Sequence, residues 1–363
     1  MPHAENRPGI DGIRGFAILF TMSVHVRNLT EGSAPGWVQG FAAMGGTAVY
    51  LFFAVSGYLL FHTSAARERH RPFSPREFLI RRAIRILPLW WILVSIVWWW
   101  KGLELPVAIS QYFFWFGFML YDSRWFPIPI SWSLFAEEVL YLFFPIFFLG
   151  IRTLRSSLVA WAISTALGIG FVVAGRALGW PEENYYLFRS PIYVAQFFFL
   201  GVALWHGLGH GTGHEQVLAD PGDTPMLRSI RASGLHLDML ALLFFAGLWV
   251  DRNIFLVPHI VTVFLCAHTH ASRVGRVLHC AWIRSFGRSC YSIYLFHFLV
   301  VDLLARIQPW PAVGGTALFA IHYLTVATAS WLVGFVGHRL VESPMQKWAN
   351  GLFRGGDMQA CRR

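Results

Sequence analysis

The chain has 363 residues, of which 56% are hydrophobic and 13% are charged, and its formal charge is +10. The charged fraction is about half of that in a soluble globular protein, while phenylalanine occurs 33 times and tryptophan 17 times. A soluble domain cannot bury so much apolar surface, which excludes a cytosolic enzyme, a disordered chain and a secreted disulfide scaffold. We therefore expect an all-α, polytopic transmembrane helical bundle whose partner is the lipid bilayer, with no nucleic-acid partner.

Apolar stretches long enough to cross a membrane occur ten times along the chain. We expect these spans near residues 13–29, 41–62, 82–100, 132–150, 156–176, 190–207, 236–251, 253–271, 289–306 and 315–338. An eleventh stretch, 105–121, is short and follows Pro106. Counting it as a crossing would place Arg152 and Arg155 on the outer side, against the positive-inside rule. We therefore predict ten spans, both termini in the cytoplasm, and 105–121 folded back or lying at the interface.

The ten spans and their short connections form one membrane domain, residues 1–345, followed by a cytoplasmic tail, residues 346–363. Among the basic residues, lysine is represented by Lys101 and Lys347 alone, and arginine accounts for the others. This bias is typical of a GC-rich bacterial genome, so we expect the protein in the cytoplasmic (inner) membrane of a bacterium.

The first span carries ionisable residues, which are costly in a membrane and indicate a functional site. Arg14 and His25 are 11 residues apart, which on a helix leaves them about 20° from the same face and separated by roughly 16 Å. Asp11 lies one turn before Arg14, close enough to pair with it. The spacing predicts a cation near the cytoplasmic mouth of a cavity and an imidazole base deeper in the same cavity. The structural alternative is a core histidine and a topology-anchoring arginine.

Two adjacent carboxylates, Glu137 and Glu138, stand near the start of the fourth span, in Trp132-Ser133-Leu134-Phe135-Ala136-Glu137-Glu138-Val139-Leu140-Tyr141. Neighbouring helix positions point about 100° apart, so the helix dipole alone does not account for both. We expect one of them to face the interior, where it pairs with an arginine or orients His25.

Arg82 and Arg85 lie one turn apart at the inner end of the third span. A pair of guanidinium groups suits phosphate recognition, which makes a cytoplasmic phosphate-bearing cofactor the natural ligand. Positive-inside anchoring and lipid-headgroup binding are an equal alternative. His297 and Asp302 match an H-x4-D pattern, but this spacing separates the two groups by about 140° on a helix, so we interpret it as coincidence. No metal site is predicted.

Taken in order, six short motifs resemble the acyltransferase-3 family of integral-membrane O-acyltransferases, in its stand-alone branch without an SGNH domain. They are Asp11-Gly12-x-Arg14-Gly15 with Arg14-x10-His25, Phe52-Phe53-Ala54-Val55-Ser56-Gly57-Tyr58, Arg81-Arg82-x-x-Arg85-Ile86-x-Pro88, Trp132-Ser133-Leu134-x-x-Glu137-Glu138-x-x-Tyr141, Ser292-Ile293-Tyr294-Leu295-Phe296-His297 and Glu342-Ser343-Pro344. The motifs cover nearly the whole chain, although Ser343 replaces the arginine that often stands in the last one.

The resemblance implies transfer of an acyl group, commonly acetyl, from cytoplasmic acyl-CoA to a hydroxyl of a saccharide, an envelope glycan or a natural product. Acyl-CoA would be a co-substrate, with no permanently bound cofactor. His25 would be the catalytic base with Arg14 as its companion, and Glu137 or Glu138 would shape the acceptor side or the charge of His25. Arg82 and Arg85 would hold the CoA phosphates. The remaining motif residues, expected to contact substrate, are Trp132, Ser133, Tyr141 and His297.

Two other hypotheses fit the same buried polar residues. A proton-coupled membrane transporter could use the His, Glu and Arg groups as a relay, although no inverted repeat is visible in the sequence. A structural membrane protein could use the same groups only to pair helices.

Overall fold

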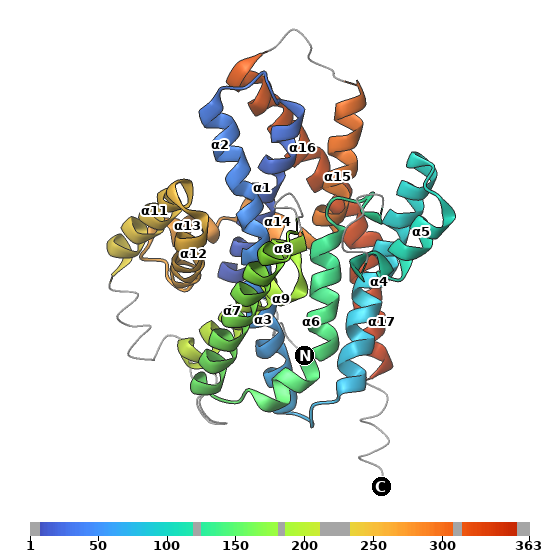
Figure 1. Cartoon of the computed structure of the whole chain (residues 1–363). Coiled ribbons are helices and arrows are strands. Elements are labelled where there is room, and N and C mark those ends of the chain that lie inside the picture. The colour runs from blue at the N-terminus through green and yellow to red at the C-terminus, as the bar shows by residue number, and fades with distance from the viewer. Residues whose placement is uncertain (1–7, 119–124, 181–185, 211–232, 308–313, 354–363) are drawn as a thin grey trace.

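The computed structural model describes residues 8–118, 125–180, 186–210, 233–307 and 314–353, and within these ranges the chain is helical and contains no strand. Figure 1 shows long helices gathered into a bundle, with α11, α12 and α13 together at one side. The helices are α1 (Pro8–Leu29), α2 (Gly36–Met44), α3 (Ala48–Glu68), α4 (Pro75–Lys101), α5 (Leu105–Tyr112), α6 (Ser131–Gly150), α7 (Leu154–Ala177), α8 (Tyr186–Arg189), α9 (Pro191–Trp205), α11 (Gly234–Val250), α12 (Arg252–Ala267), α13 (Arg273–Leu278), α14 (Ala281–Arg288), α15 (Cys290–Ile307), α16 (Gly315–Gly337) and α17 (Ser343–Leu352).

Local sequence signals fix where several of these helices begin and end. At the start of α4, the Ser74 hydroxyl accepts a hydrogen bond from the backbone N–H of Glu77. Pro75 occupies the first turn, where a backbone N–H would have no partner within the helix, so its absence loses no hydrogen bond. At the other end of α4, Gly102 takes a left-handed conformation with φ of 62°. In α7, Thr153 and Ser156 form a reciprocal capping box.

Each of the ten predicted spans corresponds to a helix. Seven segments among the described residues are long and apolar enough to cross a membrane, and the chain is therefore a multi-pass membrane protein. The first predicted span corresponds to α1, which has 22 residues but is more polar because it carries Asp11, Arg14 and Arg27. The seventh and eighth correspond to the shorter apolar helices α11 and α12. The predicted span 253–271 was too long, since α12 ends at Ala267, where polar residues follow.

The eleventh apolar stretch does not form a spanning helix in its described part. It forms the eight-residue helix α5, about 12 Å long, which is far short of a 30 Å hydrocarbon core. Indole nitrogens of α4 hold it in place, because Trp90 donates to the Gln111 carbonyl at 2.9 Å and Trp91 donates to the Tyr112 carbonyl at 3.2 Å. The described residues 105–118 thus agree with the prediction that this stretch folds back or lies at the interface, and residues 119–121 lie outside the described part of the chain.

Glycines allow several helices to cross at backbone contact. Where α3 meets α9, a Cβ added to Gly201 would lie 1.8 Å from the Ala54 carbonyl oxygen, and a Cβ added to Gly57 would lie 2.0 Å from that of Phe198. The glycine of the Phe52–Tyr58 motif therefore sets the distance between these two helices. This crossing positions Ser56, the neighbour of Gly57, for the cavity described below.

The last described helix, α17, packs back against the bundle. α16 continues through a π-helical turn, His338–Glu342, into α17, which packs against α4. The predicted domain boundary at residue 345 falls inside α17, and Gln346 lines the cavity described next.

Candidate active site

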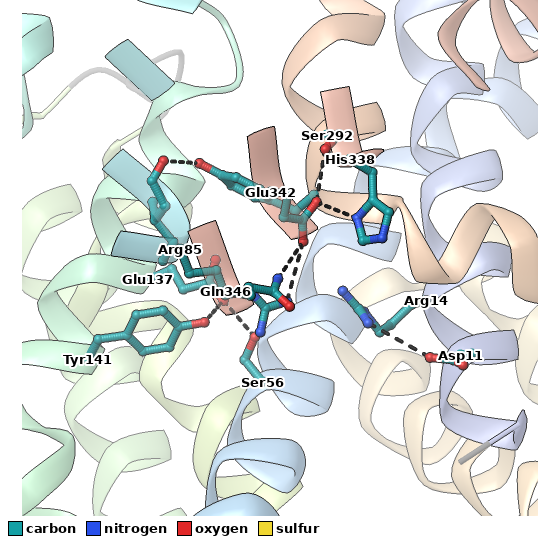
Figure 2. A network of polar contacts seen from close by, with 12 residues as sticks. Asp11, Arg14, Ser56, Arg85, Glu137, Tyr141, Ser292, His338, Glu342 and Gln346 are labelled. Atoms are coloured by element: carbon teal, nitrogen blue, oxygen red, sulfur yellow. Dashed lines mark hydrogen bonds and ion pairs between the residues drawn. The ribbon is translucent and has the colours of Figure 1, made fainter. Parts of the chain in front are cut away.

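A cavity of about 540 Å³ lies among α1, α3, α4, α6, α15 and the α16–α17 connection. Its volume is in the range typical of small-molecule and cofactor sites. Four arginines line it, against three carboxylates and two histidines: Arg14, Arg82, Arg85, Arg288, Asp11, Glu137, Glu342, His62 and His338. With four cations against three anions the cavity is net positive, which suits an anionic ligand. Figure 2 shows part of its polar network.

Arg14 reaches the cavity because the opposite side of α1 is made of glycine. A Cβ at Gly12 would lie 1.9 Å from the Leu278 carbonyl oxygen, and one at Gly15 would lie 2.0 Å from that of Ile283. These glycines let α1 pack at backbone contact against the segment containing α13 and α14. Arg14 and Asp11 form an ion pair at 3.8 Å, which confirms the pairing predicted from their spacing (Figure 2).

Arg82 and Arg85 both line the cavity, as the one-turn spacing on α4 predicts. The Arg82 guanidinium lies over the Tyr141 ring, 5.4 Å from its centre. Arg85 lies 3.9 Å from Glu342, whose side chain is 2% exposed.

Glu342 is the centre of a network that sequence analysis missed. Its carboxylate accepts hydrogen bonds from Ser292 at 2.9 Å, from His338 at 3.0 Å and from Gln346 at 3.1 Å (Figure 2). The network ties α15, the π-helical turn and α17 to Arg85 of α4. The available signal in the sequence was an acidic residue inside the last recognised motif, Glu342-Ser343-Pro344, to which no role was given.

The adjacent carboxylates of α6 diverge, as predicted. Glu137 faces the cavity, where it accepts hydrogen bonds from Ser56 at 2.6 Å and from the Tyr141 hydroxyl (Figure 2). Glu138 is not among the lining residues, and its Oε1 atom is buried with no hydrogen-bond partner in the described part of the chain. The cation Arg82 lies near both carboxylates.

Ser133 and Tyr294 both line the cavity and bond to each other, with 2.5 Å between their hydroxyl oxygens. Ser133 donates its own proton to the Ile130 carbonyl at 2.9 Å, so Tyr294 is the donor in the pair. Phe52 and Phe53 line the cavity beside them.

His25 lies outside the lining of this cavity, which corrects the prediction that Arg14 and His25 point into one cavity. Arg14 lines the cavity, whereas His25 is not among the residues that do. The His25 ring instead contacts His297, with 5.0 Å between ring centres, and His297 in turn lies 5.6 Å from the Tyr294 ring. The helical spacing gave the direction of His25 correctly, but it could not show that side chains of other helices divide the space along α1.

A cation does lie near His25, but it is Arg189 and not the predicted Arg14. Arg189, at the end of α8, lies close enough to act on the charge of His25, and its guanidinium stacks over the Trp132 ring at 5.2 Å. The two adjacent carboxylates were expected either to pair with an arginine or to orient His25. Arg82 lies near both, whereas the groups found to act on His25 are His297 and Arg189, which favours the first alternative. Asp302 bonds to Trp100 and Arg306, as expected if the H-x4-D pattern is coincidence.

Comparison with known proteins identifies the family. The family model described as an acyltransferase domain matches residues 7–336, which is most of the chain. The chain belongs to this acyltransferase family. The resemblance drawn from the six motifs is thereby confirmed, and the family assignment favours acyl transfer over the transporter hypothesis.

Several curated proteins are similar over nearly the whole chain. The peptidoglycan O-acetyltransferase OatA of Listeria monocytogenes serovar 1/2a is 24% identical, over 94% of this chain and 56% of its own length. YrhL of Bacillus subtilis (strain 168), provisionally named a peptidoglycan O-acetyltransferase, is 24% identical, over 95% of this chain and 55% of its own. The chain thus spans little more than half the length of these relatives. No solved structure matches it.

Proposed function

We propose that this membrane acyltransferase moves an acyl group, with acetyl as the first candidate, from cytoplasmic acyl-CoA to a hydroxyl of a cell-envelope glycan. The observation that carries this proposal is the net-positive cavity, whose lining residue Tyr294 contacts the histidine pair His297 and His25. Acyl-CoA has a multiply charged nucleotide at one end and a thioester at the other. The nucleotide suits the positively charged cavity, and the thioester needs a base such as the histidine pair. In this proposal the enzyme lies in a bacterial cytoplasmic membrane, with the mouth of the cavity on the cytoplasmic side.

Arg82 and Arg85 are the proposed phosphate ligands. Guanidinium groups bind phosphate through paired, charge-assisted hydrogen bonds. Glu342 keeps Arg85 at the cavity wall, and Arg82 has the Tyr141 ring as a platform. Arg14, paired with Asp11, adds positive charge on the α1 side.

The thioester reaches His25 past Ser133 and Tyr294 in this proposal. The flexible pantetheine arm extends along the cavity, while Phe52 and Phe53 provide apolar walls at its end. Opening of the Ser133–Tyr294 hydrogen bond admits the acyl group to the histidines. His25 then accepts the proton of the acceptor hydroxyl, whose oxygen attacks the thioester carbonyl.

The acceptor approaches from the side of Trp132 and Arg189. A stacked tryptophan–arginine pair offers an aromatic face for a sugar ring and a cation for an anionic substituent. The name of the Listeria relative, a peptidoglycan O-acetyltransferase, supports an envelope glycan as the acceptor.

The test is transfer of radiolabel from acetyl-CoA to envelope material in membranes carrying the wild type, His25→Gln or Arg82→Gln. The wild type is expected to transfer label, His25→Gln to bind acetyl-CoA but transfer none, and Arg82→Gln to weaken acetyl-CoA binding about tenfold, or about 1.4 kcal/mol. His259→Gln is the matched control, since His259 is a buried histidine of α12 outside the cavity. Failure of the wild type to bind any acyl-CoA, or undiminished transfer by a well-expressed His25→Gln protein, would contradict the proposal.

A further inference from the structure

We propose that His297 is a positioning residue for His25, through a histidine–histidine hydrogen bond that fixes which nitrogen of His25 takes the proton. This inference rests on the proposed function and deepens it, since sequence analysis expected His297 only to contact substrate. It starts from the contact between the two rings, which meet edge to face with 5.0 Å between centres and 64° between planes.

The hydrogen bond that His297 makes to a backbone carbonyl determines its tautomer. The ring is fully buried, and its Nδ1 atom lies 2.7 Å from the Tyr294 carbonyl oxygen. A carbonyl can only accept, so Nδ1 carries the proton of the neutral ring. Nε2 is therefore an unprotonated acceptor, and it is buried with no hydrogen-bond partner in the described part of the chain. A buried acceptor without a donor is costly, and such an atom calls for an explanation.

The adjacent ring of His25 can supply the missing donor. The χ2 torsion of histidine is broad, so a rotation of His25 can turn an N–H toward Nε2 of His297. Among the described residues, the charged or titratable groups that act on His25 are His297 from α15 and the cation Arg189 from α8, and neither is a carboxylate. His297 therefore takes the place that a carboxylate holds in a serine-protease triad, where the partner of the base fixes its tautomer.

The resulting step balances without a further reactant. The acceptor hydroxyl gives its proton to the free nitrogen of His25, and its oxygen forms a bond to the acyl carbon while the carbon–sulfur bond of the thioester breaks. His25, now doubly protonated and stabilised by Nε2 of His297, returns a proton to the CoA thiolate. His297 neither gains nor loses a proton, and its role is to hold the His25 ring and stabilise its charged form.

Two variants show whether His297 positions His25, binds substrate or only packs in the core. His297→Phe keeps the ring shape and removes both nitrogens, whereas His297→Gln keeps an acceptor for His25 and a donor for the Tyr294 carbonyl. We expect His297→Phe to lower kcat about 100-fold at unchanged KM for both substrates, and His297→Gln to restore much of the loss. A rise of KM for the acceptor with kcat retained, or an equal loss in both variants, would overturn the positioning role.

A second measurement does not depend on turnover. Diethyl pyrocarbonate modifies an unprotonated imidazole nitrogen, and peptide mass spectrometry reports the rate at His25, which is partly exposed. We expect His297→Phe to slow modification of His25 about tenfold, because the activating hydrogen bond is lost, and His297→Gln to restore it. His259→Phe is the matched control, since His259 also has a buried, unpartnered ring nitrogen.

The modification rate of His25 and the acyl-transfer assay can contradict the two proposals independently of each other. Equal modification rates of His25 in the wild type and in His297→Phe would refute the histidine pair, whatever the transfer assay shows. A wild type that transfers no acyl group but retains the dependence of His25 on His297 would refute acyl transfer and leave the pair in place.

Discussion

Replacing Gly201 with alanine should loosen the crossing of α3 and α9 and, with it, the cavity. The added Cβ would lie 1.8 Å from the Ala54 carbonyl oxygen and 2.7 Å from its carbonyl carbon, whereas ordinary contact begins at 3.4 Å. The two helices would have to separate by about 1.6 Å, because the obstacle is backbone and no side chain can turn away. Overpacking costs about 1–3 kcal/mol, and the better helix propensity of alanine returns at most about 1 kcal/mol. A clash of this size with backbone belongs at the upper end of that range, so we expect a net loss of about 2 kcal/mol in the free energy of unfolding.

The loss should be visible in both stability and activity. Ser56 lies next to Gly57 in the same crossing and holds Glu137 at 2.6 Å, so separation of the helices disturbs the cavity wall. Unfolding in detergent can be followed with a thiol-reactive fluorophore, because Cys266 and Cys290 are buried until the bundle opens. The same purified protein then serves for acetyl-CoA binding.

The matched control is Gly170→Ala in α7, where an added Cβ meets nothing within 4 Å. This variant should unfold at the same denaturant concentration as the wild type or slightly above it. Equal stability of Gly201→Ala and Gly170→Ala would refute the argument that backbone contact sets the spacing of α3 and α9.

Two further substitutions test polar groups that hold the bundle together. Glu342→Ala should lower the free energy of unfolding by about 2 kcal/mol, since it leaves the buried Ser292 hydroxyl and the partly exposed Arg85, His338 and Gln346 without their acceptor. Chemical unfolding measures this loss, and a loss below about 0.5 kcal/mol, on the order of a surface substitution, would show that the network does not stabilise the bundle. Asp238→Ala should cost about 1–2 kcal/mol, because its carboxylate accepts from the Ser272 hydroxyl and from two backbone amides at the start of α13. Asp238→Asn, which keeps one acceptor oxygen, should recover part of that loss, and an equal effect of both variants would argue against capping.

Much of the fold could be predicted from the sequence because its signals are local. The start of α4 follows from Ser74 and Pro75, and its end follows from Gly102. The one-turn spacing of Arg82 and Arg85 placed both on the cavity wall for the same reason. Such features depend only on residues within a turn or two of each other.

The features that could not be predicted join residues far apart in the chain. Glu342 meets Ser292 fifty positions away, and Ser133 meets Tyr294 across 161 positions. The separation of Arg14 from His25 belongs to the same class, because helical geometry gives the direction of a side chain but not what other helices insert along its path. The contact of His25 with His297 likewise required the packing of α1 against α15.

The hydrogen bond between Ser133 and Tyr294 also has a bioenergetic consequence. A polar passage open along the whole bundle would conduct protons and dissipate the membrane potential that energises the cell. The Ser133 and Tyr294 hydroxyls are 2.5 Å apart, so they bond directly with no water between them, and Phe52 and Phe53 line the cavity beside them. Under the proposed function, this direct contact would interrupt a water-filled path between the cytoplasmic donor and the envelope acceptor, and the enzyme could work in an energised membrane without short-circuiting it.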